Sequence, residues 1–440
     1  MCVTTPQSQS PIVNDLPITA PPPQEDNSLV LPVIGYVVDT FPSTSETFIL
    51  REVLQLRADG VWIILACMHT PRVVLHEEAR PLLSCLHVRP ALQYLDFWRH
   101  ALPEMAKWRF WLAAFQILRE AAPGGRQACW ASARSLPTGA WMASVFRREG
   151  VRHVHAHFLG ATALAGRVAA RLLRTSFSIS IHGSDLTDFS TIKRGNVTSA
   201  DFVITCTAQN RTFILDRLPG KTAEQTHLVY HGLDLAFFSR QAAIRREASS
   251  SPPDVPLILC VARLVPKKGI GALIQACGIL RKRGLTFRCE IIGEGPDRAG
   301  LESVSRQCGV ERQVSFLGEQ SQSDIMQAYL RAGVFVLACR VARDGEKDGL
   351  PNVIVEALAM EVPVVATRVG AVEELVEDGE TGLMAPQEDP TALADRIQWV
   401  LSHPEESSRL AAAGRRRVER DFDLTTDPIK AVFEKELCHI

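Results

Sequence analysis

The sequence lacks the features that define several large classes of protein. No apolar run reaches the length of a membrane span, and residues 1–30 have neither a basic start nor the apolar segment of a secretory signal. The net charge is −1, so no overall electrostatic field attracts nucleic acid. We therefore expect a cytoplasmic globular protein that does not bind nucleic acid.

Paired cysteines are also missing. The chain has 11 cysteines, an odd number, and no two of them form a C-x-x-C motif. Several lie in or beside apolar runs that are typical of strands, such as Cys67, Cys260 and Cys339. Cysteines in such places behave as small core residues in a reducing compartment, which argues against a disulfide framework and against a zinc site.

What the chain does have is length and an ordinary globular composition. Its 440 residues are too many for one typical core, and 46% of them are hydrophobic, which favours two large domains. Residues 1–30 are rich in Pro, Ser and Gln and are predicted to be a disordered arm. The predicted organisation is a first domain over residues 31–240, a polar linker over 241–255, a second domain over 256–425, and a last helix over 426–440 that crosses back to the first domain.

Short apolar runs alternate with helical patterns in both halves of the chain. In the first domain, strands are expected at Leu31–Val38, Val61–Ala66, His153–His157, Phe177–Ile181, Phe202–Cys206 and His227–Tyr230. In the second domain, they are expected at Ile258–Val261, Cys289–Ile292, Val314–Phe316, Val334–Ala338 and Val364–Ala366. The alternation predicts an α/β fold with two Rossmann-like, doubly wound parallel sheets, whose ligands bind at the carboxyl ends of the strands.

Residues 334–367 form the most informative stretch. An apolar run gives way to a charged loop, a helix follows that Pro351 is expected to open, and a second apolar run closes the unit. The free N–H groups of the first helical turn favour an anion such as phosphate. Asp348 before the helix and Glu356 within it are well suited to accept hydrogen bonds from sugar hydroxyls. The stretch therefore predicts a nucleotide-sugar pocket, although an ordinary carboxylate at a helix entry is the alternative for Asp348.

Two cations precede a helix in the second domain. Arg263 and Lys268 lie five residues apart in the turn that follows the strand at Ile258–Val261. Cations near a helix N-terminus oppose the helix dipole, and a bound diphosphate would remove that penalty. Such cations also stabilise the negative charge that develops on a nucleoside diphosphate as it leaves. The alternative is a solvated turn with ordinary surface charges.

Together these motifs resemble the donor site of retaining glycosyltransferases of family 4. The family signature has two acidic residues with seven between them, then A-x-A and P-V-V, and the pair here is Asp348 and Glu356. The family usually has Glu at the first position and Gly at the position of Glu361. The resemblance implies the GT-B architecture, with two Rossmann-like domains facing a cleft. It also implies that Arg263 and Lys268 grip the donor diphosphate without a bound metal.

The resemblance extends to residues in both domains. It places the donor against the turns that contain Gly293, Gly295, Gly318, Gly349, Leu350, Pro351 and Gly370. It also makes His182, at the end of an expected strand, the histidine that contacts the donor sugar near the reaction centre. The run FPSTSETFI resembles a subset of the family that builds exopolysaccharides, including the colanic-acid type, and assigns Ser45, Glu46 and Thr47 to the acceptor side. Helix capping by Ser45 is the structural alternative.

Two further patterns carry open alternatives. His153, His155 and His157 alternate on one expected strand, so their side chains share a face. With no carboxylate or cysteine near in sequence, structural or cleft-lining roles are favoured over metal binding. Residues 94–119 are aromatic and basic together, and the apolar side chains recur at helical spacing. That helix either packs on the sheet or rests at the inner face of a membrane.

The sequence thus predicts an enzyme that transfers a sugar from a nucleotide donor to a glycan or lipid-linked glycan, with retention at the anomeric carbon. A nucleotide-sugar epimerase on the same fold and a non-catalytic nucleotide-sugar binder are the alternatives. A dehydrogenase is disfavoured because Gly293-Glu-Gly295 does not complete G-x-G-x-x-G: position 298 is Arg.

Overall fold

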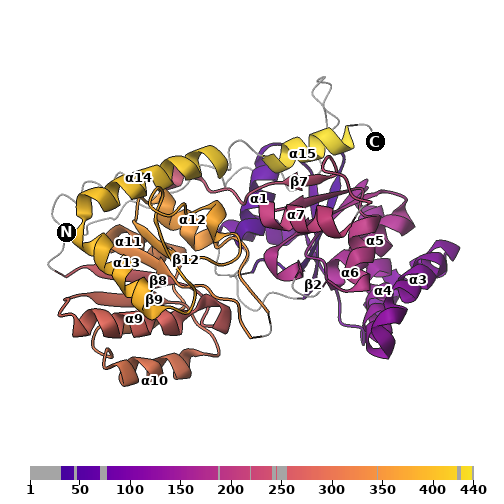
Figure 1. Cartoon of the computed structure of the whole chain (residues 1–440). Coiled ribbons are helices and arrows are strands. Elements are labelled where there is room, and N and C mark those ends of the chain that lie inside the picture. The colour runs from indigo at the N-terminus through magenta and orange to yellow at the C-terminus, as the bar shows by residue number, and fades with distance from the viewer. Residues whose placement is uncertain are drawn as a thin grey trace, which may run out of the picture.

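The computed structural model describes residues 31–43, 47–69, 77–186, 189–218, 220–239, 244, 255–343, 345–423 and 428–438. The arm expected at residues 1–30 and nearly all of the linker expected at 241–255 lie outside the described residues. Two α/β units are present, and each is built around its own parallel sheet (Figure 1). The predicted fold class is confirmed.

The first sheet has seven parallel strands in the order β3-β2-β1-β4-β5-β6-β7. Their bounds are β1 Ile34–Thr40, β2 Ile63–His69, β3 Leu86–Val88, β4 His153–His157, β5 Ser176–Ile181, β6 Phe202–Thr205 and β7 Thr226–Leu228. The helices are α1 Thr47–Ala58, α2 Leu95–Met105, α3 Trp108–Ala121, α4 Gly125–Arg148, α5 Ala161–Leu173, α6 Thr191–Ser199 and α7 Ala208–Arg217. Because the strands are parallel, β4 to β7 bring four consecutive carboxyl ends to one edge of the sheet.

The second sheet has six parallel strands in the order β10-β9-β8-β11-β12-β13. Their bounds are β8 Leu257–Val261, β9 Arg288–Ile292, β10 Val314–Gly318, β11 Val334–Leu337, β12 Val364–Thr367 and β13 Leu383–Ala385. The helices are α9 Ile270–Lys282, α10 Arg298–Cys308, α11 Gln322–Arg331, α12 Asn352–Ala359, α13 Pro390–Ser402 and α14 Pro404–Asp421. Strands β8 and β11 are neighbours, and this pairing assembles the site described below.

Local signals start several of these helices. Asp389 accepts hydrogen bonds from the backbone N–H groups of Thr391 and Ala392, and Pro390 occupies the first turn of α13. Thr207 caps α7 in the same way by accepting from the N–H of Asn210. Such caps satisfy donors that a helix leaves free at its N-terminus and stabilise it by roughly 1 kcal/mol each.

Sequence patterns were wrong or incomplete at three places. Strands β3 and β13 have three residues each, too few for a visible periodicity. Pro351 does not occupy the first helical position, because its extended backbone (φ −72°, ψ 108°) places it at the N-cap and α12 begins at Asn352. The aromatic stretch at 94–119 is two helices, α2 and α3, separated at Ala106 and Lys107.

The last helix, α15 (Pro428–Leu437), lies against the first domain although it follows the second domain in sequence (Figure 1). Its apolar face buries Ile429, Val432, Phe433 and Leu437 in the same core cluster as side chains of β1 and α1. The last described helix therefore lies on the domain in which the described residues begin. Among the helices of the described ranges, none combines the length and apolar character needed to cross a bilayer.

Candidate active site

Lys268 and Asp348 form an ion pair at the carboxyl edge of the second sheet. Lys268 ends a 3₁₀ turn (Pro266–Lys268) that follows β8, and Asp348 lies in the loop that follows β11. A Cβ atom at Gly269 would collide with the carbonyl oxygen of Ala338, and the backbone of Gly269 is left-handed (φ 62°). Glycine therefore lets the two loops approach closely, which brings the lysine and the carboxylate together.

Charges around this pair favour its ionised state. Burial by itself would raise the pKa of Asp348, but the nearby ammonium of Lys268, with Lys267 and Arg263, holds that pKa below its usual value. Burial would likewise lower the pKa of Lys268, and Asp348 outweighs it and raises that pKa. Lys267 pairs chiefly with Glu346, at 2.6 Å, and lies 3.9 Å from Asp348. Three cations thus converge on one carboxylate, an arrangement able to accept further negative charge.

The predicted glycine turns surround this pair. Gly293 and Gly295 pack against the backbone of Ala262–Leu264, the turn that carries the exposed Arg263. Gly370 is left-handed (φ 63°), and a Cβ atom there would collide with the carbonyl oxygen of Asp348. Gly318 ends β10 and bridges to Gly293. The turns after β8, β9, β10 and β12 therefore lie at the same edge of the sheet.

The two domains meet at the loop that enters α12. A Cβ atom on Gly183 would lie 2.6 Å from the Cα atom of Gly349, so the two glycine backbones touch across the domain boundary. Leu350 and Pro351 are buried directly behind this contact. His182, the residue before Gly183, is thereby held opposite the loop that carries Asp348 and enters α12. The structure brings His182, Gly349 and Asp348 into one neighbourhood.

Glu356 lies on α12 and contacts the first domain. Its Oε1 atom accepts a hydrogen bond of 3.0 Å from the guanidinium of Arg51 on α1, and the two side chains are 14% and 17% exposed. Its Oε2 atom lies 3.4 Å from the hydroxyl of Tyr329, which also donates to the carbonyl oxygen of Val353. This carboxylate, predicted to accept hydrogen bonds from sugar hydroxyls, is thus paired with a cation in this structure.

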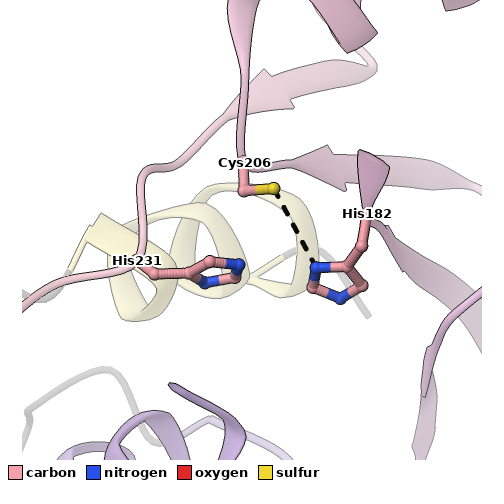
Figure 2. A group of neighbouring side chains, drawn as sticks. All are labelled: His182, Cys206 and His231. Atoms are coloured by element: carbon pink, nitrogen blue, oxygen red, sulfur yellow. Dashed lines mark hydrogen bonds between the residues drawn. The ribbon is translucent and has the colours of Figure 1, made fainter. Parts of the chain in front are cut away.

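His182 belongs to a buried chain of polar groups in the first domain. Its Nε2 atom lies 3.3 Å from Nδ1 of His157, and Nε2 of His157 lies 3.3 Å from Oε1 of Glu52. The hydroxyl of Tyr36 donates to the same carboxylate oxygen at 2.8 Å. On its other side, Nδ1 of His182 lies 3.9 Å from the sulfur of Cys206 (Figure 2). The backbone N–H of His182 donates to Asp185, which fixes the strand end as well.

The other two histidines of β4 have structural partners. The register of β4 against β5 sets His153 opposite Ser176 and His155 opposite Ser178. Each ring lies within 3.0 Å of two serine hydroxyls along β5. Burial lowers the pKa of His153 to about 3 and that of His155 well below its usual value, so both rings stay neutral. These contacts agree with a structural role for both.

Glu374 is a second contact between the domains. Its carboxylate accepts hydrogen bonds from the backbone N–H groups of Ala208 and Gln209, at 2.8 and 3.0 Å, and from the hydroxyl of Tyr230. A carboxylate from the second domain thus caps α7 of the first domain, where the helix dipole favours negative charge. Glu374 therefore holds the two domains together.

Some predicted residues lie apart, and some contacts were missed. Thr47 is the first residue of α1, whereas Ser45 and Glu46 lie outside the described residues. Arg51 and Glu52 were not predicted as site residues. A signal for Glu52 exists, because it occupies a buried position among Ile49, Val53 and Leu56, a spacing expected of apolar side chains. No local pattern marks Arg51, whose partner is 305 residues away.

A known structure shares this architecture. HepE of Anabaena, crystallised in complex with UDP, matches with a TM-score of 0.68 and 17% identity over 92% of this chain and 100% of HepE. At this identity the likeness shows the fold alone, and that fold is the two-domain GT-B architecture.

Sequence comparison places the chain within a family. Residues 242–417 match the family described as Glycosyl transferases group 1. Alpha-D-kanosaminyltransferase of Streptomyces kanamyceticus is 30% identical over 286 residues, which cover 60% of this chain and 72% of that enzyme. The chain therefore belongs to the group 1 glycosyltransferases. The putative colanic acid biosynthesis glycosyltransferase WcaL of Escherichia coli is 32% identical over 194 residues, and the match spans 46% of WcaL, less than half its length.

Proposed function

We propose that this protein is a retaining glycosyltransferase of family 4 that moves a sugar from a nucleoside-diphosphate donor to a glycan or lipid-linked glycan in exopolysaccharide biosynthesis. One observation carries the proposal: the Lys268–Asp348 ion pair lies at the entry to α12, and Gly183 of the opposite domain touches the same loop at Gly349. The similarity to WcaL, whose name refers to colanic acid, supports the exopolysaccharide part.

The cations are assigned to the donor diphosphate. Arg263 is exposed and free to fork onto two phosphate oxygens, while Lys268 supplies a compact charge. The backbone N–H groups of Gly349 and Leu350, just before α12, face the same anion. These groups stabilise the charge that develops on the leaving diphosphate, so the transfer requires no metal ion.

The two carboxylates are assigned to hydroxyl groups of the donor. Asp348 holds the sugar and Glu356 holds the ribose. In this structure both carboxylates are paired with cations, Lys268 and Arg51, so donor binding exchanges these ion pairs for contacts with the substrate.

A front-face displacement accounts for retention without a covalent enzyme intermediate. The bond between the anomeric carbon and the phosphate oxygen breaks, and the acceptor oxygen bonds to the same face of that carbon. The proton of the acceptor hydroxyl passes to the departing phosphate oxygen. His182 and Gly183 form the wall beside this centre, and Thr47 on α1, with Ser45 and Glu46, is assigned to the acceptor side.

Two other functions use the same donor site. An epimerase would consume the nucleotide sugar without an acceptor, and a binding protein would hold it without turnover. The glycosyltransferase is favoured because the first domain meets the proposed donor site at two places, through Arg51 at Glu356 and Gly183 at Gly349, so that a second domain is available for an acceptor.

The test begins with a thermal-shift panel of UDP-, GDP- and ADP-sugars, because a bound donor raises the melting temperature by mass action. The stabilising donor is then incubated with and without lipid-linked glycan acceptors from exopolysaccharide synthesis. Acceptor-dependent release of the nucleoside diphosphate, with an α-linked product from an α-linked donor, is expected. Donor consumption without acceptor would indicate the epimerase, and binding without turnover would indicate the binding protein.

The acceptor proposal extends to the membrane surface. Eight large apolar side chains on α2, α3, α4 and the segment before them are between 54% and 86% exposed: Tyr94, Leu95, Leu102, Trp108, Trp111, Leu112, Phe115 and Trp130. A different face of α3, which contains Phe110, Ala114 and Ile117, packs inward. The exposure of the aromatic stripe supports the membrane interpretation over packing on the sheet.

We assign this exposed aromatic surface to an anionic bilayer at the inner face of the cytoplasmic membrane. The exposed Arg99, Arg119 and Arg126 lie on the same helices, and Arg109 stacks on Trp108 at 5.1 Å. Aromatic side chains beside basic residues are typical of helices that rest at a lipid interface. In Figure 1, α3 lies at the end of the first domain that is farthest from the second domain.

The membrane contact is tested by co-sedimentation with liposomes that contain anionic lipid. The variant Trp111→Asn with Phe115→Ser is expected to bind severalfold less than the parent protein. The control is Val341→Ser, which removes an exposed apolar side chain in the second domain and leaves binding unchanged. Equal sedimentation of all three proteins, or none by the parent at low salt, would contradict the assignment.

A further inference from the structure

Three side chains that can ligate a metal meet at one edge of the first sheet. His182 directly follows β5, Cys206 directly follows β6, and His231 lies in the loop after β7. These strands are neighbours, so their carboxyl ends bring the three residues together (Figure 2). One nitrogen of each imidazole and the sulfur of Cys206 all lie within 4.8 Å of one another.

The distances approach those of a tetrahedral zinc site. Zinc–sulfur bonds of about 2.3 Å and zinc–nitrogen bonds of about 2.05 Å place tetrahedral sulfur and nitrogen ligands about 3.6 Å apart. The sulfur of Cys206 and Nδ1 of His182 are 3.9 Å apart. The two imidazole rings lie nearly parallel, with centroids 5.2 Å apart, and Figure 2 shows the sulfur above the space between them. A shift of a few tenths of an ångström therefore closes the sulfur–nitrogen distance.

A carboxylate behind the cluster determines which nitrogen of His182 is free. As a carboxylate, Glu52 only accepts hydrogen bonds, so Nε2 of His157 carries the proton and its Nδ1 accepts. That atom accepts from Nε2 of His182, which leaves the Nδ1 lone pair of His182 directed at Cys206. Metal-ligating histidines commonly donate their other N–H to such a partner, which fixes the tautomer and raises the basicity of the ligand.

His231 completes the set and lines a pocket. Its ring stacks on Phe48, with the ring centroids 4.1 Å apart, and no hydrogen bond within the described residues engages its ring nitrogens. Burial lowers the pKa of His231 to about 4 and that of His182 well below its usual value, so both rings are neutral at pH 7 and able to bind a cation. A pocket lined by Phe48, Glu52, Cys206 and both histidines adjoins the cluster and has room for a water as the fourth ligand.

We propose that His182, Cys206 and His231 form a binding site for a divalent ion of borderline softness, Zn²⁺ above all. Two imidazoles and one thiolate suit this ion, and one position stays open. Burial raises the pKa of the Cys206 thiol to about 12, so the S–H bond breaks only as the sulfur–zinc bond forms, and one proton passes to the buffer. The ion joins three strand ends and, if the proposed function holds, fixes the loop at Gly183 that touches Gly349. Its three ligands belong to the first domain, whereas the cations assigned to the diphosphate belong to the second.

The experiment uses the full chain, freed of metal with a chelator and kept reduced, and Co²⁺ as the spectroscopic probe. One equivalent is expected to produce a sulfur-to-cobalt charge-transfer band and the strong visible bands of four-coordinate cobalt. Zn²⁺ should displace the probe, release one proton per site and raise the melting temperature. No donor or acceptor is involved, so the result is independent of the proposed transferase activity.

Matched variants assign the ligands. Cys206→Ser abolishes the charge-transfer band, and His231→Asn weakens Co²⁺ binding at least tenfold while keeping the band at saturation. Cys438→Ser, which changes an exposed cysteine on the last helix, behaves as the parent protein. Circular dichroism confirms that each variant is folded. Absence of the band in the parent protein, or its persistence in Cys206→Ser, overturns the proposal.

Discussion

The Lys268–Asp348 pair allows a quantitative test of the site by a double-mutant cycle. The side chains are 12% and 15% exposed, so each charge is largely withdrawn from water. Removing one partner of a buried ion pair typically costs 3–5 kcal/mol, because the other charge is left without compensation. Lys267 stays 3.9 Å from Asp348 in Lys268→Ala and offsets part of that loss. We therefore expect Lys268→Ala to lower the free energy of unfolding by about 2–3 kcal/mol.

The double variant separates the pair from its surroundings. Asp348→Ala leaves Lys268 buried near Lys267 and Arg263, so we expect a loss of similar size to that in Lys268→Ala. With both residues replaced by Ala, no unpaired charge of the pair remains. The loss should then be smaller than the sum of the single losses by about 2 kcal/mol. Urea unfolding of the four proteins, followed by circular dichroism, measures this coupling energy.

The same variants report on catalysis. If Lys268 grips the leaving diphosphate, Lys268→Ala lowers the transfer rate by about 10²-fold or more. Lys267→Met is the matched control, because that ammonium is engaged with Glu346, and we expect less than a tenfold loss. Additive unfolding energies, within about 0.5 kcal/mol, would refute the ion-pair argument. Turnover near that of the parent protein in Lys268→Ala would refute the diphosphate assignment.

Three further predictions concern the cation on Glu356 and the buried histidines. Arg51→Ala removes the cation that occupies Glu356 and should tighten nucleotide binding by up to tenfold in calorimetry; weaker binding would show that Arg51 itself contacts the nucleotide. Glu52→Gln should lower kcat and change KM little, because the amide no longer fixes the tautomer of His157. A loss of kcat/KM that comes only from a higher KM would contradict this. Burial lowers the pKa of His153 to about 3, so between pH 6.5 and 3 the unfolded chain binds a proton that the folded chain does not, and stability falls by about 1.4 kcal/mol per pH unit on acidification. In His153→Gln, the free energy of unfolding, measured in urea at pH 5, 6 and 7, should depend on pH with one bound proton fewer. The same slope against pH in both proteins would count against this prediction.

Sequence patterns were informative where the physical cause is local. The apolar runs predicted eleven of the strands, and strands as short as β3 and β13 have no pattern to recognise. The turns with Gly293 and Gly370 were found because glycine is needed where backbones approach closely. Pro351 was placed one residue inside the helix, because proline tolerates both the N-cap and the first helical position, and only the backbone angles decide.

The site itself depends on which strands are neighbours, and that is a tertiary property. Lys268 and Asp348 are 80 residues apart and meet because β8 pairs with β11. No carboxylate lies near the histidines of β4 in sequence. The one that contacts His157 is Glu52 on α1, 105 residues away. The contact of Arg51 with Glu356 requires, in addition, that the two domains close on each other.

By itself, the sequence determined the α/β class, the cations and acids of the proposed donor site and the glycine turns around them, because periodicity, capping and backbone freedom act over a few residues. Only the tertiary structure decided that those charges are already paired, that the aromatic stripe of α3 faces outward, and that His182 shares a buried cluster with Cys206 and His231. Those outcomes depend on strand order and burial, which the whole chain sets together.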